Sequence, residues 1–576
     1  MTSDKPKSPR LGLYRLVTAM SLSGCLFAVL IAGGLYVLTS KRMTPGDAYA
    51  RLTRPALLTT KLHLPQHTLL TSVSFKDVTD DHNELVQEQD WLLHPTESHE
   101  LSGNLFVFEN VLDQTGQIAV KLGPLPSMRA VKSNWDLRVH ADKQGGYQAE
   151  LREDETYSWQ IINYTGGQLG QTRALHQAQR KLMASHEINF LSNTWGDRNQ
   201  DARMNEAFIL KEIQAGARLG VEVIQLDDGW QKGRTANSID AQKANGKWEG
   251  FHDTASDFWT PDLTRFPNGF EPILQAAQQA GVVIGLWYAP DSSNDFANWQ
   301  ADVKTVIQLH KQYGICHFKF DSINTRSRQG EIHLDKFFDA LAKQSDNQII
   351  VDLDITANCR PGYFGRIDCG PLFVTNRYSD WHNYWPHQTL RNLWQLSRWI
   401  DPIRMRMMFL NNTRNTELYA NDPLAPQQVS SESLFAPLMF CQPLGWFENS
   451  NLPSEYFQQV KPMVDLWKAH RQAIHAGTVF PVGHVPDGVN WSGFVSINTE
   501  QTAGYLLVCN GQQTKVDLER DMPNWVTVSE ANQLAGSGQI QVTSDKAKII
   551  DMAGQSFWFG TIQISPPNEA ASKSVH

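Results

Sequence analysis

The feature that most constrains the fold is a series of eight short apolar runs, separated by helix-like segments, between residues 186 and 475. A strand of a parallel sheet is buried on both faces, so it is apolar along its whole length. Eight such strands alternating with helices over about 290 residues predict a closed (β/α)8 TIM barrel. An open doubly wound sheet is the alternative, but no Gly-rich phosphate loop follows any run. The eight runs are 188–191, 221–226, 282–287, 316–320, 348–353, 372–375, 405–410 and 434–441.

The segments on either side of the predicted barrel have a different pattern. In 41–185, short alternating stretches such as 103–108 and 157–162 are punctuated by turn residues, which predicts an N-terminal β-sandwich. In 476–576, the stretches 504–508 and 557–560 predict a second antiparallel β domain, also a β-sandwich. A length of 576 residues is too great for one hydrophobic core, so a multidomain protein is expected.

Residues 1–40 form a separate segment. Between Arg15 and Lys41 there are 25 uncharged, mostly apolar residues, enough for a transmembrane helix. Several Lys and Arg residues precede this stretch, which favours a cytoplasmic tip with the catalytic part in the periplasm or at the cell exterior. A cleaved signal peptide is one alternative, and 22–25 resembles a lipoprotein cleavage box ending in Cys25.

Charge and cysteine content exclude some classes of partner and cofactor. The net charge is -9 and there is no long basic run, so no nucleic-acid partner is expected. The six cysteines show no C-x-x-C spacing, which argues against a structural zinc site. We predict no cofactor, and the oligomeric state stays open.

Carboxylates cluster where the predicted strands end. Asp227 and Asp228 are adjacent at the end of the second strand, Asp321 follows the fourth, and Asp380 follows the sixth. Barrel active sites lie at this end of the strands. An adjacent Asp pair is unfavourable in a poorly solvated mouth unless a ligand donates hydrogen bonds to it. One such Asp could simply cap a helix, but the whole set indicates a binding site.

A divalent metal site is the competing interpretation of these carboxylates. Lys319 lies two residues before Asp321, and so on the same face of its strand, where its ammonium would repel a cation. We therefore predict no metal and a sugar site instead, with Trp230 and Trp287 as walls of the pocket.

The motifs 226–230, 266–269 leading to 285–287, and 319–321 resemble the signature of clan D glycoside hydrolases, the α-galactosidases and melibiases of families 27 and 36. The resemblance covers roughly 185–475, and the β-rich flanks suit family 36. It implies that Asp321 is the nucleophile and Asp380 the acid/base. It also implies that Asp227, Asp228 and Lys319 bind the sugar hydroxyls.

Three departures from the family 36 pattern affect the expected substrate. Asp291 stands where those proteins usually have Glu, and 358–362 replaces their Cys-Ser-Gly-Gly segment. The segment 376–380 looks more like family 27, in which an Arg near the acid/base holds the 2-hydroxyl, so Arg377 is a further candidate.

The resulting prediction is a retaining α-glycosidase, and most specifically an α-galactosidase. It would hydrolyse terminal α-galactosyl residues of oligo- or polysaccharides by double displacement. Two alternatives remain: an α-galactosyl transglycosylase, which shares the covalent intermediate, and a non-catalytic, membrane-anchored carbohydrate-binding protein.

Overall fold

The computed structural model describes residues 59–565, apart from 131, 154–156, 186, 199, 358–359, 376–384, 410, 513, 521–526 and 543–546. The predicted transmembrane stretch and Cys25 lie outside the described residues. Within 59–565, none of the described helices has the length and apolar character needed to cross a bilayer.

The N-terminal domain consists of two antiparallel sheets with an apolar core between them, in agreement with the predicted β-sandwich. One sheet has the order β3-β2-β5-β6-β9 and the other β1-β8-β7-β4. Alternate residues of β8 are buried, as expected for a strand with one face on a core. The strands are β1 (Thr59–Leu64), β2 (Thr68–Phe75), β3 (Val86–Leu92), β4 (His99–Leu101), β5 (Leu105–Asn110), β6 (Thr115–Lys121), β7 (Leu137–Ala141), β8 (Tyr147–Arg152) and β9 (Trp159–Thr165).

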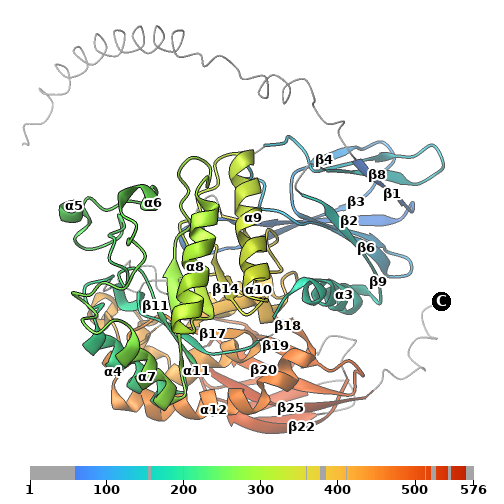
Figure 1. The fold of residues 1–576 in the computed structure, drawn as a ribbon. Helices are drawn as coiled ribbons and strands as arrows, with labels where there is room; N and C mark the ends of the chain where they lie inside the picture. The colour runs from blue at the N-terminus through green and yellow to red at the C-terminus, as the bar shows by residue number, and fades with distance from the viewer. Residues whose placement is uncertain are drawn as a thin grey trace, which may run out of the picture. The chain divides into compact units, whose positions relative to one another are not determined.

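The central domain is a closed barrel of eight parallel strands, which confirms the main prediction of the fold (Figure 1). Closure is made by β10 and β17, which pair in parallel through Leu191 and Leu444. The strands are β10 (Leu191–Asn193), β11 (Val223–Leu226), β12 (Val283–Tyr288), β13 (His317–Phe320), β14 (Ile350–Asp354), β15 (Leu372–Phe373), β16 (Met405–Phe409) and β17 (Gln442–Gly445). The principal helices around them are α4 (Glu206–Leu219), α7 (Glu271–Ala280), α8 (Trp299–Tyr313), α9 (Arg328–Gln344), α10 (Gln388–Leu396) and α12 (Ser454–Ala476).

The prediction was wrong for the eighth strand. The run 434–441 is helical, because it forms the end of α11 (Ser431–Phe435) and then the 3-10 helix η7 (Ala436–Phe440). The strand itself, β17, begins at Gln442. A run that is buried on every side has no periodicity that separates helix from strand, and Pro437 is compatible with the first turn of a helix.

The C-terminal domain contains two antiparallel sheets, and both predicted strands lie in the larger one. That sheet has the order β18-β19-β20-β25-β22, and a three-stranded sheet has the order β21-β24-β23. The strands are β18 (Thr478–Gly483), β19 (Trp491–Ile497), β20 (Ala503–Asn510), β21 (Val516–Arg520), β22 (Thr527–Gly536), β23 (Gln539–Val542), β24 (Ala547–Met552) and β25 (Ser556–Ser565).

The N-terminal sandwich is joined to the barrel by hydrogen bonds near the carboxyl ends of the barrel strands. The Thr79 hydroxyl donates to the carbonyl of Val374, just after β15. The Ala130 amide donates to Glu331 in α9 over 2.9 Å. The short 3-10 helix η1 (Thr79–Asp81) is thereby held beside the mouth of the barrel.

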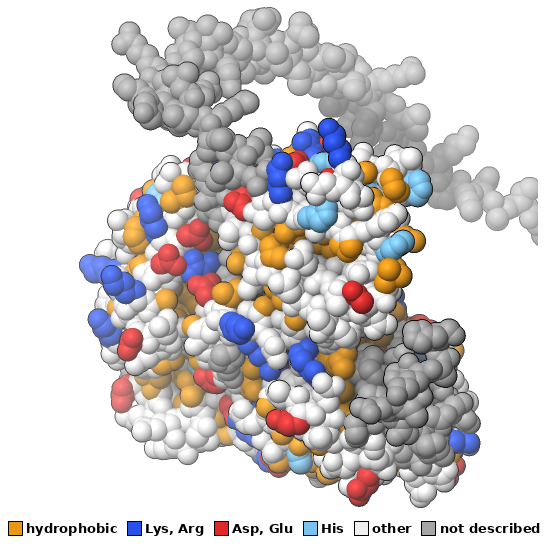
Figure 2. All heavy atoms as spheres, turned by 90° about the vertical axis from the view of Figure 1, so that its right-hand side faces the viewer, with side chains coloured by type: hydrophobic (Ala, Val, Ile, Leu, Met, Phe, Trp, Pro, Cys, Tyr) orange, Lys and Arg blue, Asp and Glu red, His pale blue; other side chains and the backbone are white. Residues whose placement is uncertain are grey.

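Figure 2 shows one face of the molecule, where acidic and basic side chains are interspersed and no large area carries a single sign of charge. This distribution agrees with the modest net charge of the chain. A face of this kind has no electrostatic feature that would attract a polyanion.

Candidate active site

A cavity of about 490 Å³ opens at the carboxyl ends of the barrel strands, where the sequence placed the active site. Its volume suits a small-molecule ligand such as a sugar unit with part of its neighbour. Residues from the sandwich, the barrel and the loops around the mouth contribute to its lining. They are Asp80, Trp195, Gln200, Asp227, Asn237, Trp248, Ser292, Lys319, Asp321, Ser322, Ile323, Asn324, Arg326, Asp354, Thr356, Ala357, Arg360 and Trp446.

Lys319 is the electrostatic centre of the cavity. Its Nζ lies 3.1 Å from a carboxylate oxygen of Asp227 and 3.4 Å from oxygens of both Asp321 and Asp354. The Lys319 side chain is 2% exposed, so these ion pairs are largely shielded from solvent. Burial opposes the charged form of Lys319, but the three carboxylates outweigh that effect and raise its pKa above the usual range. Lys319 therefore stays protonated.

Asp321 follows β13 directly and is held as an ionised carboxylate. One oxygen lies 2.7 Å from Arg360 Nη1, and the other accepts a hydrogen bond of 3.0 Å from Trp287 Nε1. Burial tends to raise the pKa of Asp321, but Arg360 and Lys319 lower it well below the usual range for Asp. Its side chain is still 20% exposed, whereas the Asp227 side chain is 4% exposed. Asp321 is thus charged, oriented and accessible, as a carboxylate nucleophile must be.

Asp227 lies deeper in the cavity and is also held on several sides. Its carboxylate accepts a hydrogen bond of 2.7 Å from Asn193 as well as the ion pair with Lys319. Burial raises the pKa of Asp227, although Lys319 acts in the opposite direction.

The Lys319 ammonium also lies over the rings of Phe373 and Trp446, at 4.6 and 5.3 Å from their centroids.

Asp228 is not among the residues that line the cavity, and its role as a sugar ligand stays a prediction. Its two oxygens accept hydrogen bonds from the Gln231 amide, over 2.6 Å, and from the Thr235 hydroxyl. Burial is the main cause that raises the pKa of Asp228, to about 7. Successive residues at a strand end point in different directions, so Asp227 enters the cavity while Asp228 is directed into the following loop.

The two Trp residues predicted as pocket walls are both buried, at 1% exposure or less, and neither is among the lining residues. Trp287 acts on the site through its N–H group, which is bonded to Asp321. Trp230 lies one layer further back, where its Nε1 donates to the carbonyl of Trp287 over 2.9 Å. An aromatic residue beside a motif is not necessarily exposed, because a buried ring is the more favourable arrangement.

The predicted acid/base Asp380 and the candidate Arg377 lie outside the described residues. Asp354 lies within 3.1 Å of Arg360 Nη1 and accepts hydrogen bonds from the amide and hydroxyl of Thr356. Asp354 therefore belongs to the ion-pair cluster of the cavity.

Sequence reasoning missed several residues of the cavity. Arg360 lies in the segment that departs from the family 36 pattern, so no motif indicated it. Trp446 follows β17, and placing the last strand too early concealed it. Trp195 likewise lies just after a barrel strand, β10. The one sequence signal that could have indicated both Trp residues is their position immediately after a predicted strand. Asp80 comes from the sandwich, and no local pattern indicates such a contribution.

No group of three or more His, Cys, Asp or Glu side chains within the described part of the chain is arranged to hold a metal ion. In the cavity itself, Lys319 and Arg360 occupy the space between the carboxylates. The charge that a cation would supply is therefore already present on side chains.

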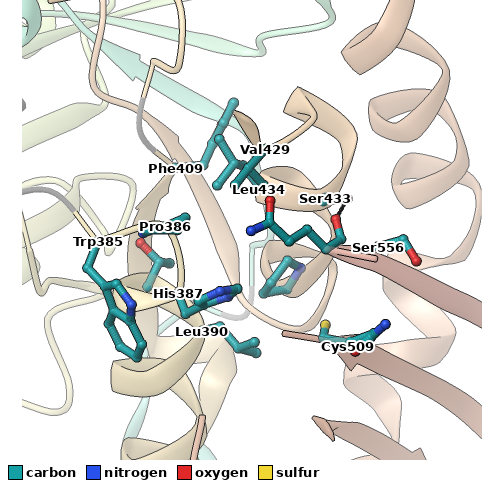
Figure 3. A pocket seen from close by; sticks show the side chains of 14 residues that line it. Trp385, Pro386, His387, Leu390, Phe409, Val429, Ser433, Leu434, Cys509 and Ser556 are labelled. Carbon is teal, nitrogen blue, oxygen red and sulfur yellow. Dashed lines mark hydrogen bonds between the residues drawn. The ribbon is translucent and has the colours of Figure 1, made fainter. Parts of the chain in front are cut away.

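A second pocket lies between the barrel and the C-terminal sheet (Figure 3). His387 and Leu390 line it on the barrel side, and Cys509 and Ser556 on the other. Its volume is about 40 Å³, far below the 490 Å³ of the cavity at the mouth of the barrel and too small for a sugar. It is therefore not the substrate site.

Comparison with known proteins gives similarity to α-galactosidases in part of the sequence. No family model matches the chain. A stretch of 199 residues is 26% identical to α-galactosidase 2 of Pediococcus pentosaceus and covers 32% of this chain and 24% of that protein. A stretch of 90 residues is 31% identical to the α-galactosidase of Escherichia coli and covers 16% and 11%, respectively. The matched stretches thus span about a quarter or less of these relatives.

The structural likeness extends over most of the chain. A variant of the GH36 α-galactosidase AgaA of Geobacillus stearothermophilus, in complex with 1-deoxygalactonojirimycin, matches with a TM-score of 0.61 at 12% identity. The match covers 88% of this chain and 77% of that one. The α-galactosidase of Lactobacillus brevis matches with a TM-score of 0.60 at 13% identity, over 89% and 75%. The chain therefore shares the multidomain fold of GH36 α-galactosidases.

Proposed function

We propose that this protein is a retaining α-galactosidase. The observation that carries the proposal is the ionised Asp321, fixed between Lys319 and Arg360 at the mouth of the barrel, beside Asp227. The sequence similarity to α-galactosidases and the shared fold support the same function. Placement in clan D, with family 27-like features in 376–380, is part of this proposal.

In the first step, an Asp321 oxygen attacks the anomeric carbon and the bond to the leaving oxygen breaks. In the second step, water attacks the same carbon and releases Asp321. Two inversions give net retention of the α configuration. Lys319 and Arg360 keep Asp321 in the ionised form that attack requires, without a metal ion.

In the proposed complex, Asp227 and Lys319 recognise the galactose ring. Galactose differs from glucose by its axial 4-hydroxyl, so discrimination requires polar groups at that position. A buried carboxylate next to an ammonium offers both an acceptor and a donor for adjacent hydroxyls. A glucose ring would leave part of this buried pair unsatisfied, which disfavours its binding.

The wild-type protein is expected to hydrolyse nitrophenyl α-galactoside with a kcat/KM on the order of 10³-fold or more above that for the α-glucoside. Proton NMR of the early product should show α-galactose before mutarotation. Equal rates on the two substrates contradict the proposed specificity, and β-galactose as first product contradicts double displacement.

We propose Asp380 as the acid/base that protonates the leaving oxygen and later takes a proton from water. Asp380→Ala is expected to lower turnover of an oligosaccharide by about 10²- to 10⁴-fold. α-Galactosyl fluoride needs no proton on its leaving group, so its first step should be spared while breakdown of the intermediate slows. Pre-steady-state release of fluoride measures this difference, and equal losses on both substrates point to another acid.

We further propose that residues 16–40 anchor the protein in a membrane, with the active site outside the cytoplasm. The support is their uncharged, apolar sequence and the Lys and Arg residues before it. The full chain should then sediment with membranes at alkaline pH and be released by detergent; release by alkaline buffer alone argues against a spanning helix.

A further inference from the structure

Between β11 and α7 the chain forms a long insertion, defined here as residues 231–256, which includes the short helices α5 (Ala241–Ala244) and α6 (Phe251–Thr254). Figure 1 shows α5 and α6 extending to one side of the barrel strands. This insertion contributes Asn237 and Trp248 to the active-site cavity. It is not part of any motif that indicated the catalytic residues.

Trp248 differs from the other Trp residues that line the cavity in its exposure. It is 44% exposed, whereas Trp195 is 5% and Trp446 is 3% exposed. The two buried rings form inner walls, but Trp248 presents much of its indole to solvent at the rim. Because Trp248 lines the cavity and is also exposed, its ring is available as an apolar stacking surface for a ligand that enters the site.

The backbone before Trp248 is closed into a tight loop. Lys247 pairs with Thr235 in a parallel bridge, and its carbonyl accepts a hydrogen bond of 3.0 Å from the Ala236 amide. Gly246 lies against Thr235, whose carbonyl oxygen would lie 2.2 Å from an added Cβ atom. The Thr235 hydroxyl is in turn bonded to Asp228 at the end of β11. Asp228 thus fixes the base of the insertion.

The backbone after Trp248 is fastened to other strand ends. The Glu249 carboxylate pairs with Arg326, at 2.8 Å, and accepts a hydrogen bond from Ser292, at 3.2 Å. The Gly250 amide donates to Asp291 over 2.7 Å, and Asp291 follows β12. Both neighbours of Trp248 are therefore held, which fixes the backbone position from which the indole extends.

The groups around Trp248 suit a neutral, hydroxylated partner. Gln200, Asn237 and Asn324 supply amide groups at the same cavity. The charge of Arg326 is balanced by its ion pair with Glu249. An apolar ring bordered by neutral hydrogen-bonding groups matches a sugar, which has an apolar C–H face and polar edges.

We propose that Trp248 is the platform on which the ring of the leaving group stacks, so that this residue sets the preference of the site between a sugar and a small leaving group. The inference rests on the proposed function and assigns the leaving-group contact to a residue of the insertion. Asp321 defines where the galactosyl ring reacts, and Trp248 lines the same cavity at an exposed position. A rigid indole provides this contact area at a small cost in conformational entropy.

The test compares a substrate that has a sugar leaving group with one that has none. With the detergent-solubilised full chain, Trp248→Ala is expected to lower kcat/KM for raffinose by about tenfold or more. For α-galactosyl fluoride, whose leaving group is a single atom, kcat/KM should stay within about twofold. Trp248→Phe keeps an aromatic face and should restore most of the activity on raffinose.

Acceptor transfer provides a second readout that a merely structural role would not change. An acceptor sugar must occupy the same platform to attack the covalent intermediate, so Trp248→Ala should lower the ratio of transfer to hydrolysis. The matched control is Ile239→Ala, an exposed apolar residue of the same insertion that does not line the cavity. Ile239→Ala should leave kcat/KM for both raffinose and α-galactosyl fluoride unchanged.

If Trp248→Ala lowers kcat/KM equally for raffinose and α-galactosyl fluoride, or leaves kcat/KM for raffinose unchanged, the proposed role of Trp248 is wrong. The α-galactosidase assignment then still stands. A wild-type chain that turns over neither substrate overturns the assignment itself, and the platform with it. Melting temperatures of the Trp248 variants should match the wild type, because the side chain is largely outside the core.

Discussion

Asp321→Gly is expected to reduce hydrolysis of α-galactosides by about 10⁴-fold or more, the loss typical of removing a nucleophile. The effect should appear in kcat even for activated substrates, because Asp321 forms the covalent bond in the first step. Lys319 and Arg360 remain to balance Asp227 and Asp354, so the fold should be retained. Steady-state kinetics and circular dichroism of the variant measure the two expectations.

Azide should restore part of the activity of Asp321→Gly. The variant leaves a space beside Lys319 and Arg360, where two cationic groups can attract a small anion. Azide would attack the anomeric carbon once, which gives β-galactosyl azide by a single inversion. Wild-type turnover by Asp321→Gly would show that another residue is the nucleophile, and an α-linked azide would contradict attack from this face.

Lys319→Met is expected to lower both stability and activity. The variant removes a buried ammonium from within 3.4 Å of three carboxylates. Breaking a buried ion pair by removing one partner costs about 3–5 kcal/mol of unfolding free energy. The loss of activity should be roughly 10²- to 10³-fold, as for removal of one preorganised electrostatic group.

The pH dependence of Lys319→Met has a defined sign. Lys319 lowers the pKa of Asp321, so its removal must raise that pKa. Asp321 must be ionised to attack, and the acid limb of the kcat/KM profile should therefore move to higher pH. A profile that moves to lower pH, or does not move, contradicts the coupling between the two residues.

Lys461→Met is a matched control for the stability effect. Lys461 forms an ion pair with Asp465 on the surface of α12, where the two side chains are 37% and 55% exposed. Surface pairs of this kind contribute about 0–1 kcal/mol, so urea unfolding should distinguish the two Lys variants clearly. If Lys319→Met lowered the unfolding free energy as little as Lys461→Met, the buried carboxylates would not need the Lys319 charge for stability.

The sequence predicted the barrel because its determinants are local. A parallel strand covered on both faces must be apolar throughout, and seven of the eight runs overlap a strand for that reason. The eighth run failed because complete burial removes the periodicity that separates helix from strand. Lys319 and Asp321 were placed together correctly, since residues two apart on a strand share a face.

The tertiary structure alone decided how the site is completed. Asp227 and Asp228 are adjacent in sequence, yet one enters the cavity and the other fixes the insertion, because side-chain direction depends on the turn that follows β11. Arg360 reaches Asp321 from a loop after another strand, and Asp80 comes from a different domain. Such contacts depend on how distant segments pack, and no pattern in one stretch of sequence encodes them. The sequence by itself therefore determined the barrel and the Lys319–Asp321 pair, while long-range packing determined which residues surround that pair.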